Sequence, residues 1–293
     1  MLHNSQLRTI MDTSFKLVKT VLEDLDKLIT KIHGPKGTAL IQDKLNSLAQ
    51  EYRTLTSAIR NPIDYKDPVT RFAYVFSYVA AHSSYVKQKL LSNATLYSIL
   101  KKQEPLRVTC VGGGPGSEML GLLQACMSID RQKPLTVWLL DGEESWSETW
   151  AEIDTRLDAT FKLSTNFRQS DVTNYKTFDN LQKAFSSDIF IMSFFLSEIY
   201  SFRQQAAPFF ARMVSDMPPG CAILYIDNSS DQFNEYAGSI FDDKQFELLD
   251  SATKVVLLPG NSEQKSDLEP YNTKFARTPK VQSHASVRVW RKK

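Results

Sequence analysis

Residues 108–118 read VTCVGGGPGSE, in which a run of β-prone and apolar residues stops at three consecutive glycines. A glycine turn directly behind a buried strand lets the backbone approach a ligand closely, because glycine lacks a Cβ atom and tolerates unusual dihedral angles. In a parallel α/β sheet, ligands bind beyond the carboxyl ends of the strands. The turn is therefore the first place to expect a binding site, although a tight strand-to-helix turn without a ligand has the same composition.

The spacing of the glycines narrows the ligands that such a turn can hold, which include NAD, FAD, a nucleotide phosphate and S-adenosylmethionine (SAM). No Gly-Lys-Ser or Gly-Lys-Thr follows the turn, so a phosphate-binding P-loop is excluded. The dinucleotide fingerprint GxGxxG needs a glycine at position 117, where the chain has Ser117. The glycines at 112, 114 and 116 form GxGxG instead.

Short apolar, β-leaning runs alternate with longer segments after residue 105. Segments such as 117–129 and 145–158 are long enough for crossover helices, which predicts a doubly wound, mostly parallel sheet. We expect two further strands, at 253–260 and 285–290, to pair as an antiparallel edge, with a polar loop and no helix between them. The predicted strands, seven in all, contain RVTCV, LTVWLLD, FRQSDV, SDIFIMSFF, CAILYID, TKVVLLPG and ASVRVW.

The first hundred residues predict helices. Apolar residues recur at steps of three and four from Leu7 to Ile32 and from Ile41 to Ile59, with HGPKGT (33–38) between the two stripes. Asp67 followed by Pro68 is a typical start for a third helix. We therefore expect an α/β fold with a helical cap region at 1–104 and a ligand-binding domain at 105–293. The third helix also carries a polar and aromatic face: Arg71, Tyr74, Tyr78, His82 and Tyr85.

Acidic residues follow the glycine turn at two later strand ends. Asp141 closes LTVWLLD, about 25 residues after the turn, and Asp171 follows in QSDV. With these acids, the stretch resembles motif I and the strand order of the class I SAM-dependent methyltransferases. The resemblance implies that the turn runs under the methionine and ribose portions of SAM. The cofactor-binding glycines would be Gly112, Gly113, Gly114 and Gly116.

The same resemblance assigns further residues to the SAM site. It implies that Asp141 holds the ribose hydroxyls, that Asp171 and Val172 meet adenine, and that the fourth strand, ending at Ser193, lines the methyl-transfer pocket. A carboxylate suits the first role because it accepts two hydroxyl hydrogen bonds at once. The local alternatives are a helix N-cap for Asp141 and an ordinary turn-forming acid for Asp171.

Several residues outside these motifs are candidates for the same site. Trp146 would pack over the adenine face, and its alternative is a core position. Arg71 would bind the methionine carboxylate through two hydrogen bonds, and Tyr78 would close over SAM from the same helix face. The alternative for both is a polar helix face packed on another helix.

The chain departs from the family pattern at two places. Cys110 stands where many members carry an acid, so we expect Glu118 or a backbone carbonyl to meet the SAM amino group instead. The fourth strand ends in Ser193, Phe194 and Phe195, without the Asp/Asn-Pro-Pro-aromatic tetrapeptide that many members use to methylate exocyclic amino groups of bases.

The sequence also looks like a largely uncharacterised eukaryotic group of methyltransferases, which is distantly similar to fungal ribosomal-RNA base methyltransferases. This narrower resemblance rests on five stretches. They are DPVTRFAYVFSYVAAHSSYV, VGGGPGSE, DGEESWSETW, SDIFIMSFFLSEIY and LYIDNSS.

Composition leaves the methyl acceptor open. The net charge of +2 predicts no strong nucleic-acid or anionic-membrane partner. Residues 1–105 nevertheless carry 15 lysines and arginines against 9 acids, and the remainder 20 against 24. An RNA acceptor and a small-molecule acceptor both fit, and no apolar run reaches the ~20 residues of a membrane span. Three cysteines without ligand spacing predict no metal site and a reducing compartment, cytoplasmic or nuclear.

We therefore expect a SAM-dependent methyltransferase with SAM as its cofactor. One alternative is a catalytically silent SAM-binding sensor or subunit, and another is a nicotinamide-dependent oxidoreductase. No catalytic residue is assigned, because a general base is needed only for an acceptor that carries a proton at the reacting pH. The candidates for such a base are Glu198, His82 and Tyr78, and the Asp227-Asn228 pair is a candidate for substrate binding.

Overall fold

A computed structural model of the chain describes residues 13–54, 63–148, 159, 161–178, 180–261, 263 and 265–293. Some predicted features lie outside these residues. They are the beginning of the first apolar stripe (Leu7, Ile10 and Met11), the end of the second (Leu55 and Ile59), and most of the crossover segment 145–158.

Seven strands form one sheet in the order β3-β2-β1-β4-β5-β7-β6. Strand β7 runs antiparallel to both of its neighbours, and the pairs among β1 to β5 are parallel. The predicted mostly parallel sheet with an antiparallel C-terminal strand is confirmed. Strand β7 lies one place in from the edge, which β6 forms. The strands are β1 Leu106–Val111, β2 Leu135–Asp141, β3 Leu163–Gln169, β4 Ile189–Ser193, β5 Ala222–Asn228, β6 Phe246–Leu257 and β7 Ser283–Lys292.

Three predicted boundaries differ from the structure. Strand β3 ends at Gln169, so Asp171 lies in the following loop and does not close the strand. Strand β6 begins at Phe246, seven residues before the predicted start. The segment between β6 and β7 contains a 3-10 turn, Lys265–Leu268, and helix α12, Glu269–Phe275, where we expected a loop. Tertiary packing explains this helix, because the ring of Phe275 lies 5.6 Å from that of Phe72.

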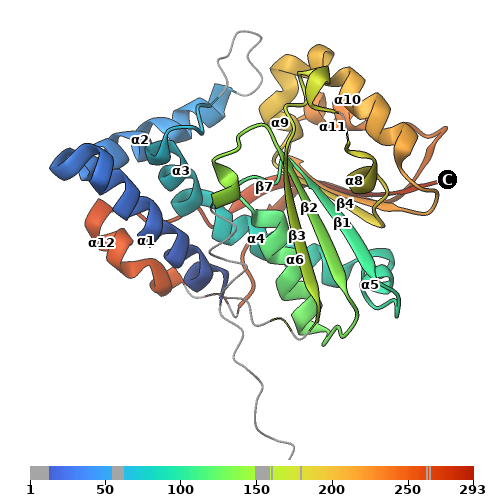
Figure 1. The fold of residues 1–293 in the computed structure, drawn as a ribbon, viewed down its shortest axis with the longest axis horizontal. Helices are drawn as coiled ribbons and strands as arrows, with labels where there is room; N and C mark the ends of the chain where they lie inside the picture. The colour runs from blue at the N-terminus through green and yellow to red at the C-terminus, as the bar shows by residue number, and fades with distance from the viewer. Residues whose placement is uncertain are drawn as a thin grey trace, which may run out of the picture.

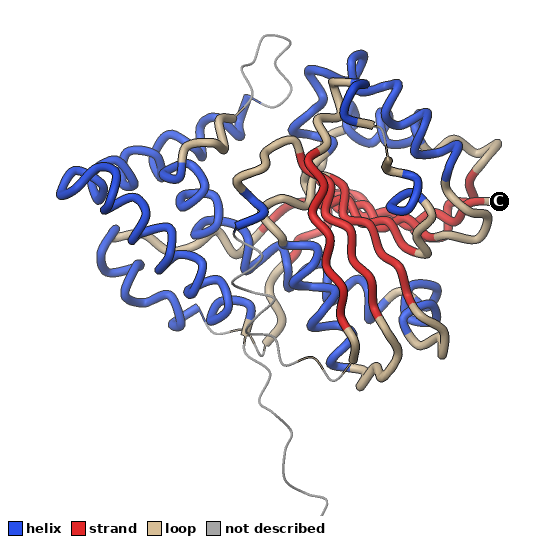
Figure 2. Tube along the Cα trace, viewed as in Figure 1, coloured by secondary structure: helices blue, strands red, loops and turns tan. Residues whose placement is uncertain are grey.

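Helices cover both faces of the sheet (Figures 1 and 2). Successive strand residues point to opposite faces: Ile189 and Ile191 join one apolar cluster, whereas Phe190 and Met192 join the other. Helices α4 (Ala80–Ser92), α5 (Ala94–Leu100) and α6 (Ser117–Ser128) lie on the first face. On the second lie α8 (Gln182–Phe185), α9 (Leu196–Ile199), α10 (Arg203–Asp216) and α11 (Asp231–Ile240).

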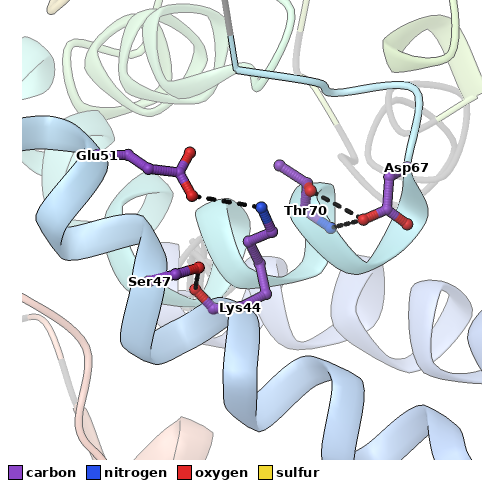
Figure 3. Close-up of polar contacts among 5 residues, drawn as sticks. All are labelled: Lys44, Ser47, Glu51, Asp67 and Thr70. Atoms are coloured by element: carbon purple, nitrogen blue, oxygen red, sulfur yellow. Dashed lines mark hydrogen bonds and ion pairs between the residues drawn. The ribbon is translucent and has the colours of Figure 1, made fainter. Parts of the chain in front are cut away.

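The N-terminal helices form a group beside the sheet, and α12 joins them from the other end of the chain (Figure 1). They are α1 Ser14–His33, α2 Gly37–Glu51 and α3 Pro68–Tyr74. The predicted start of the third helix is confirmed, since the Asp67 carboxylate accepts hydrogen bonds from the Val69 and Thr70 amides at 3.0 and 3.2 Å. Figure 3 shows the contact with Thr70. In α2, Lys44 Nζ lies 3.4 Å from Glu51 Oε1 (Figure 3).

The third helix continues through a π-helical turn, Val75–Val79, into α4. Both of its predicted faces are buried, because the helix lies between the N-terminal helices and the sheet. Arg71 is only 4% exposed and His82 only 5% exposed. The polar and aromatic face is therefore an internal surface.

Helices α4 and α6 approach each other most closely at a glycine. A Cβ atom on Gly121 would lie 2.4 Å from the Ser83 carbonyl oxygen and 2.9 Å from the Val86 Cβ. The Ser83 oxygen is a backbone atom, and the Val86 Cβ is bonded directly to the backbone of the same packed helix. Neither atom can therefore move aside without a cost in packing energy. The absence of a side chain at this position sets the distance between the two helices.

We expect Gly121→Ala to lower the free energy of unfolding by about 1–3 kcal/mol, because the added methyl group forces α4 and α6 apart. Gly238→Ala in α11 is the matched control. There a Cβ would meet only Arg288 Nη1 at 3.8 Å, so we expect a gain of about 0.5–1 kcal/mol from helix propensity. Urea unfolding followed by circular dichroism measures both. Equal effects at the two positions would contradict the close-packing explanation.

Candidate functional site

A cavity of about 510 Å³ lies beyond the carboxyl ends of β1 to β4, where parallel sheets bind ligands. Residues 63–66, which precede α3, cover it from the helical side. We call it the main cavity. It is lined by Ile63, Asp64, Tyr65, Lys66, Tyr74, Gly112, Pro115, Leu140, Asp141, Gly142, Glu143, Trp146, Ser170, Asp171, Val172, Thr173, Ser193, Phe194, Phe195, Glu198, Ile199 and Phe202.

The glycine turn forms one wall of the main cavity with no room for side chains. Gly112 has a φ of +69°, and a Cβ on it would lie 2.0 Å from the Phe195 ring. A Cβ on Gly114 would lie 2.3 Å from Trp146. Gly116, with a φ of +87°, is the left-handed residue that begins α6. Gly112 and Gly116 are therefore needed for their positive φ angles. Gly112 and Gly114 are needed because a side chain there would collide with Phe195 or Trp146.

Of the four glycines in the turn, only Gly112 lines the main cavity, and Gly113 lies on the side of the core. Its amide and that of Gly112 both donate to the Leu140 carbonyl oxygen, at 3.2 and 2.8 Å. A Cβ on Gly113 would lie 2.7 Å from the Cys110 Cβ, on the side of the core. These bonds fix the turn to the end of the neighbouring strand β2.

Asp141 lies at the end of β2 and contacts the glycine turn directly. Its Oδ2 accepts a hydrogen bond from the Gly114 amide at 3.0 Å, and its Oδ1 accepts one from the Glu143 amide at 2.9 Å. Burial raises the pKa of this carboxyl to about 6, although the two amides act in the opposite direction. The Ser145 amide donates to Glu143 Oε1, not to Asp141, and Asp141 lines the main cavity beside the turn.

Asp171 and Val172 line the main cavity from the loop after β3. The Asp171 Oδ1 accepts hydrogen bonds from the amide and the hydroxyl of Thr173, at 2.9 and 2.7 Å. This carboxylate therefore shapes its own turn. Asp171 and Val172 nevertheless both line the main cavity after the end of β3.

An aromatic wall closes the main cavity opposite the sheet. Trp146 is fully buried, and its ring lies 5.5 Å from Tyr65 and 6.4 Å from Tyr74. Tyr65 belongs to the loop that precedes α3, so this wall joins the helical region to the glycine turn. Flat rings in this position suit a planar ligand.

Glu118 lies in the first turn of α6, 2% exposed and just outside the main cavity. Burial raises its pKa to about 8, and the nearby Asp141 and Glu198 carboxylates add to this effect, whereas the Ser193 backbone opposes it. Glu118 therefore carries a proton at neutral pH. An approaching cation would favour the loss of that proton.

Four buried polar atoms at or beside the main cavity have no hydrogen-bond partner among the residues that the structure describes. They are Trp146 Nε1, Ser170 Oγ, Ser193 Oγ and Glu118 Oε2. Buried polar groups are normally hydrogen-bonded. Two hydroxyls, one N–H donor and one carboxyl group around a cavity fit a ligand that has hydroxyl, amino and ring-nitrogen groups.

Arg71 does not line the main cavity. Its Nη1 donates to the carbonyl oxygens of Tyr65 and Lys66 at 2.8 and 2.9 Å. Burial lowers the pKa of the guanidinium, and the surrounding acids, led by Glu143, oppose this. Arg71 thus fixes the backbone of Tyr65 and Lys66, which line the main cavity, from outside that cavity.

Two tyrosines that sequence reasoning missed connect the helical region to Glu198 of α9. The Tyr52 hydroxyl donates to Glu198 Oε1 at 2.5 Å, and the Tyr65 hydroxyl lies 2.7 Å from that of Tyr52. Tyr65 also reaches both Glu198 oxygens at 3.3 Å. Burial raises the pKa of both phenols well above the usual range. The sequence showed Tyr52 only as one member of an apolar stripe.

Tyr78 and His82 lie beside a second, smaller space and do not line the main cavity. This side chamber has a volume of about 250 Å³. Asn228 lines it too, but Asp227 does not: the Asp227 carboxylate accepts hydrogen bonds from the Ser197 and Asn228 amides and supports the start of α9. The side chamber is lined by Ala49, Tyr52, Tyr74, Tyr78, His82, Phe194, Asn228 and Lys280.

The described part of the chain holds no group of three or more His, Cys, Asp or Glu side chains placed to bind a metal ion. All three cysteines are buried and free. None of the described helices combines the length and the apolar character that crossing a membrane requires.

Three solved structures illustrate what this chain is similar to, and two of them are described as SAM-dependent methyltransferases. TrmN from Thermus thermophilus is 12% identical with a TM-score of 0.40, over 73% of this chain and 53% of TrmN, so the chain spans about half the length of that protein. A SAM-dependent methyltransferase from Methanosarcina mazei is 12% identical with a TM-score of 0.41, over 68% and 97% of the two chains. A provisionally assigned class I SAM-dependent methyltransferase from Listeria monocytogenes is 9% identical with a TM-score of 0.42, over 95% and 88%.

No protein-family model and no curated protein matches the sequence. The chain therefore resembles SAM-dependent methyltransferases in structure at low sequence identity. At these TM-scores the likeness is no argument for an activity or a substrate. None of the comparisons supports the narrower resemblance to a eukaryotic group.

The Tyr52–Glu198 contact allows a direct test of how the helical region is attached. We expect a double-mutant cycle of Tyr52→Phe and Glu198→Gln to give a coupling of about 1–3 kcal/mol in the free energy of unfolding, because the phenol donates to a carboxylate. Tyr175→Phe, at a tyrosine that is 70% exposed, is the control and should change nothing. A coupling near zero would mean that the contact does not hold the two parts together.

Proposed function

We propose that the protein is a SAM-dependent methyltransferase whose main cavity binds SAM. The observation that carries the proposal is the contact between the GxGxG turn and Asp141, which lies at the ends of two neighbouring parallel strands and opens into a cavity of about 510 Å³. This volume falls within the range of small-molecule and cofactor sites, roughly 300–1,000 Å³. The seven-stranded sheet with its antiparallel β7 is the one expected for this class.

The residues around the cavity suit the parts of SAM. In the proposed complex the turn of Gly112, Gly113, Gly114 and Gly116 runs under the methionine and ribose portions. Asp141 accepts hydrogen bonds from the ribose hydroxyls through the lone pairs that the two amides leave over. The adenine ring lies between Trp146 and the loop of Asp171 and Val172.

The methionine end of the cofactor belongs, in this proposal, near Ser193 and Glu118. The buried carboxyl of Glu118 takes the place of the acid that Cys110 does not provide, and it pairs with the amino group. Arg71 acts indirectly, because its guanidinium fixes the Tyr65 loop. Tyr78 lies outside the main cavity, where it forms part of the wall of the side chamber.

When bound, SAM would supply an electrophilic methyl group to a lone pair of the acceptor, with S-adenosylhomocysteine as the other product and any acceptor proton passing to solvent. The chain itself aligns the acceptor and excludes water through its aromatic walls. Burial lowers the pKa of His82 to about 3, and burial raises that of Tyr78 to about 12. Neither is a suitable base near neutral pH, and the third candidate, Glu198, already accepts hydrogen bonds from Tyr52 and Tyr65. We therefore propose an acceptor that needs no general base.

Calorimetry with SAM, S-adenosylhomocysteine and NAD tests the proposal. We expect binding of the first two and none of NAD. Binding of NAD alone would overturn the proposal in favour of an oxidoreductase. Transfer of a radiolabelled methyl group into fractionated cell extract then separates an enzyme from a silent SAM-binding sensor, for which no fraction would be labelled.

We expect Asp141→Ala to weaken SAM binding at least about tenfold, because a carboxylate hydrogen bond to a ribose hydroxyl is worth about 1.5–3 kcal/mol. The thermal unfolding curve should stay cooperative, which shows that the fold is kept. Asp171→Ala is the comparison, since its carboxylate already bonds to Thr173, and we expect a smaller loss. Unchanged affinity in Asp141→Ala would remove this residue from the site.

We expect SAM binding at pH 7 to release a proton from Glu118. Its pKa of about 8 in the free protein keeps it protonated, and the cofactor ammonium would stabilise the carboxylate. The release should disappear above about pH 9, where the free protein has already ionised. Calorimetry in phosphate and Tris buffers, which differ in ionisation enthalpy, counts the protons. An unchanged count in Glu118→Gln would show that Glu118 does not meet the amino group.

A further inference from the structure

We propose that the side chamber is the acceptor site, and that the acceptor is a small planar aromatic or heteroaromatic molecule that carries an anionic group. This inference rests on the proposed methyl transfer, since it names the class of molecule that receives the group. Its evidence is separate, because it comes from residues that do not touch the GxGxG turn.

The side chamber adjoins the main cavity at the ends of β4 and β5. Tyr74 and Phe194 line both spaces and form the boundary between them. A nucleophile at this boundary would face the main cavity while the rest of the acceptor stayed in the side chamber. The position therefore suits the partner of a transferred methyl group.

Flat rings make up most of the chamber wall. The imidazole of His82 stacks on Phe194 with ring centroids 3.9 Å apart and an interplanar angle of 14°. His82 also stacks on Tyr78 at 5.7 Å, and Tyr52 meets Tyr78 edge-on at 5.2 Å. Rings arranged in this way favour a planar ligand over a branched aliphatic one.

The charges around the chamber favour an anion. Among its lining residues, all within the described part of the chain, none carries a carboxylate, and Lys280 is the cation at the rim. Its Nζ lies 5.9 Å from the centroid of the Tyr78 ring. The neighbouring Lys280 helps to lower the pKa of His82, after burial, so the imidazole stays neutral. The Glu198 carboxylate lies on the main-cavity side of Tyr52 and already accepts hydrogen bonds from the Tyr52 and Tyr65 hydroxyls, so at the rim a cationic ligand would meet the ammonium of Lys280.

The size of the chamber limits the acceptor to a small molecule. Its volume of about 250 Å³ lies below the roughly 300–1,000 Å³ of sites for drug-sized ligands. Ala49 and Asn228 are half-buried and Lys280 is exposed, so the chamber opens to solvent between α2 and the loop before β7. One ring system with its anionic group toward Lys280 fits this shape.

Saturation-transfer NMR with three matched probes tests the site in the full-length protein, with and without S-adenosylhomocysteine. The probes are 4-hydroxybenzoate, the cationic tyramine, and cyclohexanecarboxylate, which has the charge without the flat ring. We expect 4-hydroxybenzoate to bind at least about tenfold more tightly than the other two, since both ring stacking and charge contribute. Equal binding of the anion and the cation would overturn the proposal.

Two variants locate the binding. Lys280→Gln should weaken 4-hydroxybenzoate binding at least about tenfold, whereas Lys183→Gln, at an exposed lysine of α8 on the other face of the sheet, should not. Ala49→Phe should fill the chamber and abolish probe binding while SAM binding and the thermal unfolding curve stay unchanged. Probe binding that survives both Lys280→Gln and Ala49→Phe would place the probe elsewhere and overturn the proposal.

The outcomes also separate this inference from the proposed function. SAM binding without any 4-hydroxybenzoate binding would overturn the acceptor class alone. Probe binding without SAM binding would overturn the methyltransferase and leave an aromatic-anion site. An oligouridylate that binds through the chamber, and loses binding in Ala49→Phe, while 4-hydroxybenzoate does not bind, would show an RNA acceptor instead.

Discussion

The hydrogen bond from the Gly114 amide to the Asp141 carboxylate is the contact on which the site depends. It joins the turn after β1 to the end of β2 at 3.0 Å, and the Leu140 carbonyl oxygen reinforces it with two bonds from Gly112 and Gly113. Because a Cβ at Gly114 would collide with both Asp141 and Trp146, the turn can take this position only with glycine. The carboxylate, the indole and the glycine backbone are therefore held in one arrangement, with the main cavity above them.

The features of the site that could be predicted from the sequence are those that depend on short stretches of the chain. The glycine turn, Asp141 at a strand end and the alternation of strands and helices could be predicted from the sequence, because each depends on a few neighbouring residues and on the rule that ligands bind beyond the carboxyl ends of parallel strands. The covering wall could not be read in this way. Tyr52, Tyr65 and Glu198 come together from positions up to 146 residues apart, and no local pattern marks such a meeting.

Helix α12 shows the same limit in the fold. Its segment is rich in polar residues and reads as a loop, yet Tyr271 and Phe275 are buried against Phe72 of α3. Tertiary packing stabilises a helix of seven residues that would be marginal in isolation. The Lys274 ammonium also meets Asp26 of α1 at 2.9 Å. The group of helices beside the sheet thus combines segments from before and after residue 104, the predicted boundary of the helical region.

The backbone departs from its usual geometry where the main cavity and the side chamber meet. Phe194 has a φ of +56°, which is unusual for a bulky residue. A hydrogen bond from its amide to the Ile226 carbonyl oxygen, at 2.7 Å, and the stack on His82 hold it there. On the opposite side, the helix leaves α-helical geometry for the π-helical turn that contains Tyr78. Strained backbone and π-helical turns persist where the surrounding structure fixes them, and both are frequent at functional sites. The two departures lie beside Tyr74, Tyr78 and Phe194, where the proposed methyl group and its acceptor would meet. Irregular backbone geometry is thus found at the position where the proposed methyl transfer needs a defined geometry.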